Sequence, residues 1–210
     1  PLLSSFERHI LTRFHKGEIV PMSKTRAKLK NYLYPIPAVP VSCTDSDGRP
    51  NIITVAWTGV ACGTPPMVSI AINLMRYSHG IIKETGTFCI NIPDNETLYA
   101  TDYCGNVSGK DVDKFQELGL TPVKGEETGC HYIDECPINM ECQVRHSIVL
   151  GSHELFIGEV VAVHARDGVL TAEGRVNMDN LKLFTYVGPD YYAIGEKLGQ
   201  YGYSVSRRSR

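Results

Sequence analysis

The chain has 210 residues, of which 42% are hydrophobic, and a formal net charge of −2. This length predicts one domain with a substantial core, and the near balance of charge leaves a nucleic-acid-binding role without an electrostatic basis. Apolar runs such as Met67 to Ile72 are far shorter than the roughly 20 residues of a membrane helix, and no secretory signal pattern opens the chain, so we expect a cytoplasmic protein without a membrane partner. Only the tail, residues 207–210, is a basic run, and we expect it to be solvated.

The first thirty residues differ in composition from the rest of the chain. They are polar and basic, and their one apolar cluster, Ile10 to Phe14, predicts a short amphipathic helix. Met22 has the sequence context of a mature start, so we hypothesise that residues 1–21 are non-native or peripheral. We therefore assign residues 1–30 to an N-terminal extension and residues 31–210 to one domain.

From Pro35 onward, short β-type runs alternate with turn residues. Ala38 to Cys43 and Asn51 to Thr58 predict two strands joined as a hairpin by the turn Asp45 to Gly48. Two further runs alternate with period two and predict strands with one buried face. Their apolar positions are Val68, Ile70 and Ile72 in the run 67–73, and Phe88, Ile90 and Ile92 in the run 87–92.

Helical patterns lie between and after these strands. Residues 79–85, 95–103 and 111–118 predict three short helices, the first ending at Gly86 and the last at Gly119. Two long strands, 139–150 and 155–166, are expected to join at Gly151-Ser152, and residues 183–203 are expected to form strand and loop. Together these elements predict a mainly β fold, an antiparallel barrel with several short helices.

The segment from Asn73 to Ser78 has the features of a phosphate site. A strand is expected to end at Asn73 and a helix to begin near Ser78, so free N–H groups, a hydroxyl and the guanidinium of Arg76 would meet there. The alternative is an ordinary serine cap on the helix, with Arg76 in solvent.

Two other segments are candidates for ligand contact. Small and hydroxyl residues surround the single tryptophan in Thr54 to Thr58, so a planar ligand could approach the backbone there; the alternative is a core tryptophan. Ser108 to Phe115 is either a loop and helix start with Lys114 directed at a ligand, or a solvated helix.

The seven cysteines include no Cys-x-x-Cys pair, the spacing that many zinc and iron–sulfur sites use. The nearest approach to a metal-binding set is Cys130, His131, Cys136, Cys142 and His146. We favour the simpler interpretation, reduced thiols packed as small hydrophobic side chains, and predict no metal site.

Taken in order, the motifs of the chain resemble those of one family, the flavin reductase-like proteins, and most of all its flavoredoxin-like branch. The resemblance runs from about Asn31 to the Tyr/Gly-rich C-terminal part. It is carried by Gly48-Arg-Pro-Asn51-x2-Thr54-Val-Ala-Trp57, Pro65-Pro66, Arg76-Tyr77-Ser78, Phe88-Cys-Ile-Asn91-Ile-Pro93 and Ser108-Gly-x3-Asp113-Lys114-Phe115.

The resemblance implies an FMN-binding, antiparallel Greek-key split β-barrel that forms a homodimer, with the flavin at or near the subunit interface. Lys114, beside the ring, would be a candidate for raising the flavin potential. The implied cofactor-binding residues are Thr54, Val55, Ala56, Trp57 and Thr58 along the ring and ribityl chain, Asn73, Arg76, Tyr77 and Ser78 at the ribityl chain and phosphate, and Ser108 and Lys114 on the opposite side.

The leading functional hypothesis is hydride transfer from NADH or NADPH to FMN, with electrons passed on to a redox partner protein or to free flavin. The cofactor carries this chemistry, so no catalytic side chain is required, and we expect His79 to complete the helix start rather than to contact nicotinamide. The alternatives are an electron carrier that does not use nicotinamide, a split barrel binding haem or metal, and an enzyme similar to pyridoxamine-phosphate oxidase. The sequence contains no G-x-G-x-x-G motif that would identify nicotinamide binding.

Overall fold

The computed structural model describes residues 24–205. The amphipathic helix expected at Ile10 to Phe14, the hypothesis about residues 1–21 and the basic run 207–210 therefore lie outside the described residues. The described residues from Leu33 to Val205 form one compact unit. The described residues that precede it, 24–32, belong to a separate unit and contain no helix or strand.

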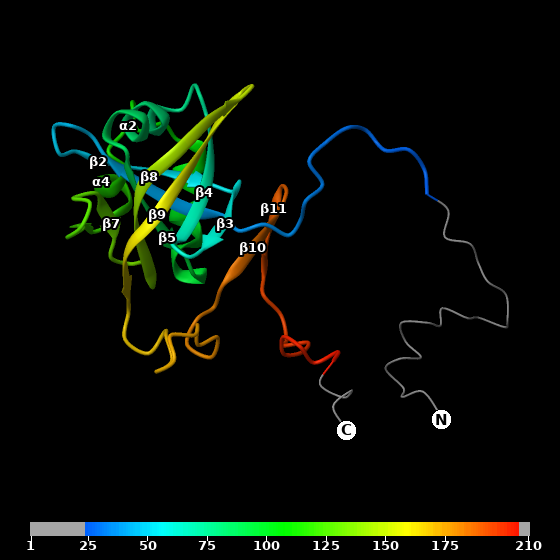
Figure 1. The fold of residues 1–210 in the computed structure, drawn as a ribbon. Helices are drawn as coiled ribbons and strands as arrows, with labels where there is room; N and C mark the ends of the chain where they lie inside the picture. The colour runs from blue at the N-terminus through cyan, green and yellow to red at the C-terminus, as the bar shows by residue number, and fades with distance from the viewer. Residues whose placement is uncertain (1–23, 206–210) are drawn as a thin grey trace, which may run out of the picture. The chain divides into compact units, whose positions relative to one another are not determined.

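An antiparallel sheet of seven strands dominates the compact unit, which confirms the prediction of a mainly β fold (Figure 1). The strand order is β2-β1-β5-β8-β9-β4-β3, and the long strands β8 and β9 run side by side through the middle of the sheet. The strands are β1 (Val39–Thr44), β2 (Pro50–Val55), β3 (Thr58–Gly63), β4 (Pro66–Asn73), β5 (Thr87–Ile92), β8 (Ile138–Leu150) and β9 (His153–Ala165).

The connection between β2 and β3 closes this sheet into a barrel. The two strands are at opposite ends of the strand order, yet only Ala56 and Trp57 separate them in sequence. Three steps along an extended chain cover at most about 11 Å, so the two edges of the sheet must approach each other. The backbone N–H of Ala71 in β4 also donates to the carbonyl of Trp57, with an N···O distance of 2.8 Å.

The prediction of a single strand from Asn51 to Thr58 was wrong. The strand β2 ends at Val55, the chain bends at Ala56-Trp57, and Thr58 already belongs to β3. Both halves of the segment are rich in β-type residues, so composition alone does not reveal that the chain changes from one edge of the sheet to the other.

The barrel interior is filled by one apolar cluster, and the alternation predicted for β4 is confirmed. In β5 the predicted inward residues Phe88 and Ile90 join this cluster, but the opposite face is buried as well, so the prediction of a single buried face was wrong for this strand. Backbone and side chain approach closely at Gly158 in β9, where a Cβ atom would lie 2.6 Å from Cζ of Phe88, so only glycine fits. The cluster includes Val41, Cys43, Ile53, Val55, Val68, Ile70, Ile72, Phe88, Ile90, Cys142 and Phe156.

The three predicted helices are present, with shifted boundaries. They are α2 (Tyr77–Thr85), α3 (Leu98–Asn106) with a preceding 3-10 turn η1 (Asn95–Thr97), and α4 (Lys114–Leu118). The helix α4 begins three residues later than expected because the carboxylate of Asp113 caps it, accepting a hydrogen bond from the N–H of Gln116 at 3.1 Å. A second apolar cluster packs α3 and α4 against β2; its buried members are Ile52, Cys104, Phe115, Ile133 and Cys136.

Two small hairpins complete the compact unit. The hairpin of β6 (Pro122–Lys124) and β7 (His131–Ile133) was not predicted, whereas β10 (Phe184–Val187) and β11 (Asp190–Ala193) fall within the C-terminal stretch expected to contain strand. Each helix among residues 24–205 is too short or too polar to cross a membrane.

Candidate functional site

Two adjoining cavities, each of about 210 Å³, lie where β2, β4, α2 and α3 meet. They share the side chains of Ile53 and Arg76, and together they fall within the roughly 300–1,000 Å³ range of small-molecule sites. The first is lined by Ile53, Thr54, Val55, Ala56, Trp57, Ala71, Ile72, Asn73, Arg76 and His153. The second is lined by Ile53, Met75, Arg76, Tyr77, Ser78, Cys104, Gly105, Val107, Ser108, Gly109 and Lys114.

The first cavity has an aromatic wall, formed at the bend between β2 and β3. The side chain of Trp57 is 46% exposed, and its ring contacts the imidazole of His153 with centroids 4.4 Å apart. Ala56 and Ala71 leave the adjacent backbone accessible, which suits a flat ligand. The hydroxyl of Thr54 donates its hydrogen to the carbonyl of Thr101 in α3, so toward a ligand it can only accept a hydrogen bond.

The second cavity lies at the N-terminus of α2. Arg76 occupies the N-cap position, and the described residues give its guanidinium no hydrogen-bonding or ionic partner. Ser78 is buried, and its hydroxyl accepts a hydrogen bond of 2.7 Å from the amide of Asn51. A helix N-terminus with a free guanidinium attracts an anion, because both present N–H donors and positive charge.

Lys114 adds a buried cation to the same cavity. The residue is only 4% exposed, and its Nζ donates to the carbonyl oxygens of Ile52 at 2.7 Å and Cys104 at 2.9 Å. Within residues 24–205 it forms no ion pair with a carboxylate. Desolvation by burial lowers the pKa of Lys114, the thiols of Cys104 and Cys43 oppose this effect, and the charge of Arg76 adds to it. A buried, uncompensated ammonium group favours an anionic ligand.

Ten of the eleven predicted cofactor-binding residues line these two cavities. The exception is Thr58, which pairs with Ile70 in the β3–β4 ladder and lines neither cavity. Lys114 lines the second cavity and not the cavity beside Trp57, whereas the resemblance implied a place beside the flavin ring. It is neither solvated nor free, since its ammonium group is already bonded to backbone. The residues on the walls are Thr54, Val55, Ala56, Trp57, Asn73 and Arg76 in the first cavity and Arg76, Tyr77, Ser78, Ser108 and Lys114 in the second.

Sequence reasoning missed His153, the aromatic partner of Trp57. It is the first residue of β9, directly after the predicted turn Gly151-Ser152, and it pairs with Asn73 at the end of β4. The turn could be recognised from the sequence, but the register between β4 and β9 joins residues eighty positions apart and leaves no local signal.

A buried ion cluster attaches helix α2 to strand β9. Glu154 is 2% exposed; one carboxylate oxygen lies 2.8 Å from Nε2 of His79, and the other accepts a hydrogen bond from Lys83. The bond from Lys83 is the main reason that the pKa of Glu154 is lowered to about 2. His79 lines neither cavity, and this contact joins the first turn of α2 to β9.

The cysteine and histidine residues considered for a metal do not converge on one point. Cys142 packs in the barrel interior and Cys136 in the second apolar cluster, and burial raises the pKa of each thiol to about 12. Among the described residues no group of three His, Cys, Asp or Glu side chains is arranged to hold a metal ion.

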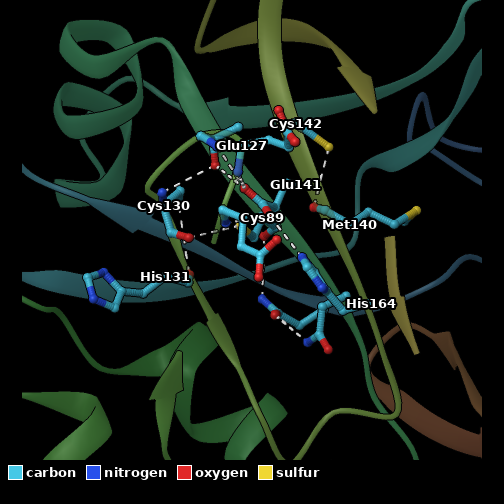
Figure 2. A network of polar contacts seen from close by, with 12 residues as sticks. Cys89, Glu127, Cys130, His131, Met140, Glu141, Cys142 and His164 are labelled. Atoms are coloured by element: carbon cyan, nitrogen blue, oxygen red, sulfur yellow. Dashed lines mark hydrogen bonds and ion pairs between the residues drawn. The ribbon is translucent and has the colours of Figure 1, made fainter. Parts of the chain in front are cut away.

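Glu141, the neighbour of Cys142 in β8, is bound by hydrogen bonds from within the protein (Figure 2). Glu141 is fully buried and accepts hydrogen bonds from the N–H of Thr128 and from Nε2 of His164, both at 2.8 Å. Burial acts to raise the pKa of Glu141, but the bonds from His164 and Thr128 outweigh this effect and lower it. Glu141 therefore secures the loop that precedes β7.

Known proteins are similar to this chain in sequence. Residues 32–186 match the flavin reductase like domain. An uncharacterised protein of Archaeoglobus fulgidus is 32% identical over 146 residues, which is 70% of this chain and 81% of that protein. The FMN reductase (NADH) RutF of Stutzerimonas stutzeri is 26% identical over 132 residues, which is 62% of this chain and 72% of that protein.

A solved structure has the same architecture. The flavoredoxin of Desulfovibrio vulgaris (Miyazaki F) superimposes with a TM-score of 0.79 at 34% identity, covering 85% of this chain and 97% of that one. This similarity confirms the expected split-barrel fold. Because the family domain matches most of the chain, the protein belongs to the flavin reductase-like family.

Proposed function

We propose that this protein is an FMN-binding oxidoreductase that accepts hydride from NADH or NADPH. The observation that carries the proposal is the pairing of the two cavities. An aromatic wall at Trp57 and His153 adjoins, through Ile53 and Arg76, a cavity with a helix N-terminus and the buried ammonium of Lys114. A flat ring system connected to a phosphate matches this arrangement.

The residues present fit FMN group by group. Trp57, Ala56 and Ala71 provide a surface for the tricyclic ring, and Arg76, together with the first N–H groups of α2, faces the position of the phosphate. The uncompensated charge of Lys114 is consistent with an anion in the second cavity. The side chain of Asn73 is fixed by the bond that its oxygen accepts from the N–H of Met75 at 3.0 Å, so its NH₂ group remains available to the ligand.

When bound, FMN supplies the hydride- and electron-transfer chemistry. The chain would supply binding and orientation: Trp57 and the strand ends beside it would hold the ring, and Arg76 and Lys114 would neutralise the phosphate. No side chain in either cavity needs to exchange a proton for this role. The use of NADH is supported by the S. stutzeri reductase, a relative with that activity in its name.

A second candidate function is electron carriage between protein partners without direct use of nicotinamide. It is supported by the structural similarity to the flavoredoxin of D. vulgaris, whose identity to this chain is higher than that of the reductase. Both functions require the same flavin site. They differ in whether nicotinamide reaches the ring.

We further propose that the protein is a cytoplasmic homodimer whose redox partner is a second protein or free flavin. Apolar side chains exposed on the edge strand β3 and at the tip of the β8–β9 hairpin support a contact between copies. Val60 in β3 is 85% exposed, and Ile148, Val149 and Leu150 at the hairpin tip are each more than half exposed.

An anaerobic experiment on the full-length protein tests the two functions. The protein is reconstituted with FMN, and the flavin absorbance is followed by stopped flow after mixing with NADH or NADPH. Rapid bleaching by either nucleotide supports the reductase. Bleaching by dithionite but by neither nucleotide supports the electron carrier, and failure to bind FMN contradicts both proposals.

A further inference from the structure

A buried asparagine lies behind the proposed phosphate site. Asn51 belongs to β2, is 7% exposed, and lines neither of the two cavities that we assign to the flavin. Its side chain nevertheless packs against two walls of the second cavity, helix α2 at Ser78 and the loop before α4 at Gly109. Asn51 is therefore placed to influence the site without touching a ligand.

Toward α2, Asn51 acts as a hydrogen-bond donor. Its Nδ2 donates to Oγ of Ser78 at 2.7 Å. A serine hydroxyl has one hydrogen to donate and two lone pairs that accept, whereas an amide NH₂ group can only donate. The bond from Asn51 therefore occupies a lone pair of Oγ and leaves the hydroxyl hydrogen for a different acceptor. Ser78 is 2% exposed and lines the second cavity, where a ligand can provide that acceptor.

Within the described part of the chain, the hydroxyl hydrogen of Ser78 has only a weak alternative acceptor, the thiol of Cys43. Burial raises the pKa of this thiol to about 12, and hydrogen bonds from Asn51 and Ser78 oppose the rise only in part. The sulfur is therefore uncharged at neutral pH, and a neutral thiol accepts hydrogen bonds poorly. A phosphate oxygen carries charge and forms a shorter, stronger bond. A phosphate in the second cavity would thus be preferred over the thiol.

The orientation of the Asn51 amide is fixed from two sides. A Cβ atom at Gly109 would lie 1.9 Å from Oδ1 of Asn51, so only glycine lets the loop approach this closely, and the oxygen faces the loop. The two atoms that accept from the NH₂ group, Oγ of Ser78 and Sγ of Cys43, lie on the nitrogen side. The nitrogen, and not the oxygen, therefore stays directed at the serine.

We propose that Asn51 is a positioning residue for the flavin phosphate, whose amide holds the hydroxyl of Ser78 as a hydrogen-bond donor toward the anion. This inference rests on the proposed function, because it requires a phosphate in the second cavity. Asn51 acts through Ser78 alone. Its contribution to affinity therefore depends on the phosphate of the ligand and disappears when Ser78 lacks its hydroxyl.

The test is a double-mutant cycle, measured by calorimetric titration of the protein with FMN and riboflavin. Ser78→Ala is expected to weaken FMN roughly three- to tenfold, and Asn51→Ala roughly two- to fivefold, with riboflavin nearly unchanged. In the Ser78→Ala background, Asn51→Ala should weaken FMN no further. The phosphorus NMR resonance of bound FMN should move in both single variants, because each alters the hydrogen bond to the phosphate.

An isosteric variant tests the direction of the hydrogen bond. Asn51→Asp keeps the shape of the side chain, but an ionised carboxylate only accepts, so it takes the hydrogen of Ser78 and turns a lone pair toward the ligand. FMN should weaken by at least about tenfold, more than in Asn51→Ala, because the added charge also repels the phosphate. Asn139→Ala removes another buried amide, outside both cavities, and is the matched control. It should lower thermal stability and leave the ratio of FMN affinity to riboflavin affinity unchanged.

The outcomes separate this inference from the proposed function. If wild type does not bind FMN, both are overturned. If wild type binds FMN but Ser78→Ala has no effect on its affinity, only the role of Asn51 is overturned. The same holds if Asn51→Ala weakens FMN and riboflavin equally, or weakens FMN as much without the hydroxyl of Ser78 as with it, because Asn51 then acts on the fold.

Discussion

The two ends of the candidate site, which we propose hold the flavin ring and its phosphate, are built in contrasting ways. At the ring end, Trp57 is nearly half exposed, and its only described aromatic contact is with His153. At the phosphate end, Lys114 and Ser78 are almost fully buried and bonded to neighbouring groups. The first is an accessible aromatic surface, and the second adds the buried ammonium of Lys114 to the guanidinium of Arg76, which both cavities share.

This contrast predicts that the two ends contribute differently to flavin binding. A buried charge interacts strongly with a ligand because little water screens it, so most of the affinity for flavin should come from the phosphate end. The ring end contributes stacking and must stay open to the electron donor and acceptor. Comparing FMN with riboflavin, which lacks the phosphate, separates the two contributions.

The largest expected effect is that of Lys114→Met. Loss of a buried ammonium facing the phosphate should weaken FMN binding by about 1.5–3 kcal/mol, or roughly 10- to 150-fold, and leave riboflavin nearly unchanged. Calorimetric titration with both ligands measures the ratio, and a thermal melt accounts for the lost bonds to Ile52 and Cys104. Lys124→Met, an exposed lysine in β6, is the control. An equal loss for both ligands would show that Lys114 acts on the fold and not on the phosphate.

The same lysine predicts a pH dependence. Burial lowers the pKa of Lys114 in the free protein, and a bound phosphate would raise it, so binding should be accompanied by proton uptake at alkaline pH. The affinity for FMN is therefore expected to fall as pH rises through the free-protein pKa, approaching the loss seen for Lys114→Met. Titrations between pH 7 and roughly pH 10 measure this effect. Riboflavin affinity should not show this fall beyond the titration of the flavin itself, and an unchanged FMN-to-riboflavin ratio across the range would contradict the prediction.

Arg76→Ala should have a smaller effect at the same end. Its guanidinium is exposed and partly screened by water, so we expect a loss of about 1 kcal/mol, or roughly fivefold, in FMN affinity. High salt should reduce the difference between variant and wild type. Arg175→Ala, in an exposed loop outside the cavities, is the matched control. Unchanged FMN affinity at low salt would exclude a phosphate contact.

The smallest effect on affinity is expected from Trp57→Leu at the ring end. Loss of one stacking surface should cost about 0.5–1 kcal/mol, or roughly two- to fivefold, and to the same extent for FMN and riboflavin. The flavin absorbance band should shift, because the ring loses an aromatic neighbour. A change in the ratio of FMN affinity to riboflavin affinity would contradict the proposal that Trp57 contacts only the ring.

The sequence predicted the elements better than it predicted their spatial relations. Periodicity located β4 and β5, because an apolar face leaves a local record, but it did not predict that both faces of β5 are buried. The site required long-range information: Asn73 meets His153 only through the β4–β9 register, and the burial of Lys114 depends on the packing of α3 and α4 against β2. The change of sheet edge at Ala56-Trp57 was missed for the same reason, since residues on both sides favour strands.

The two-residue link at Ala56-Trp57 also limits how this protein can vary. It joins the two edges of the sheet and also carries Trp57, the aromatic wall of the first cavity. A change in the length of the link would therefore also move this aromatic wall. One inserted residue there would shift the pairing of β3 with β4 by one position and exchange the two faces of β3. At this link the number of residues is therefore as constrained as their identity.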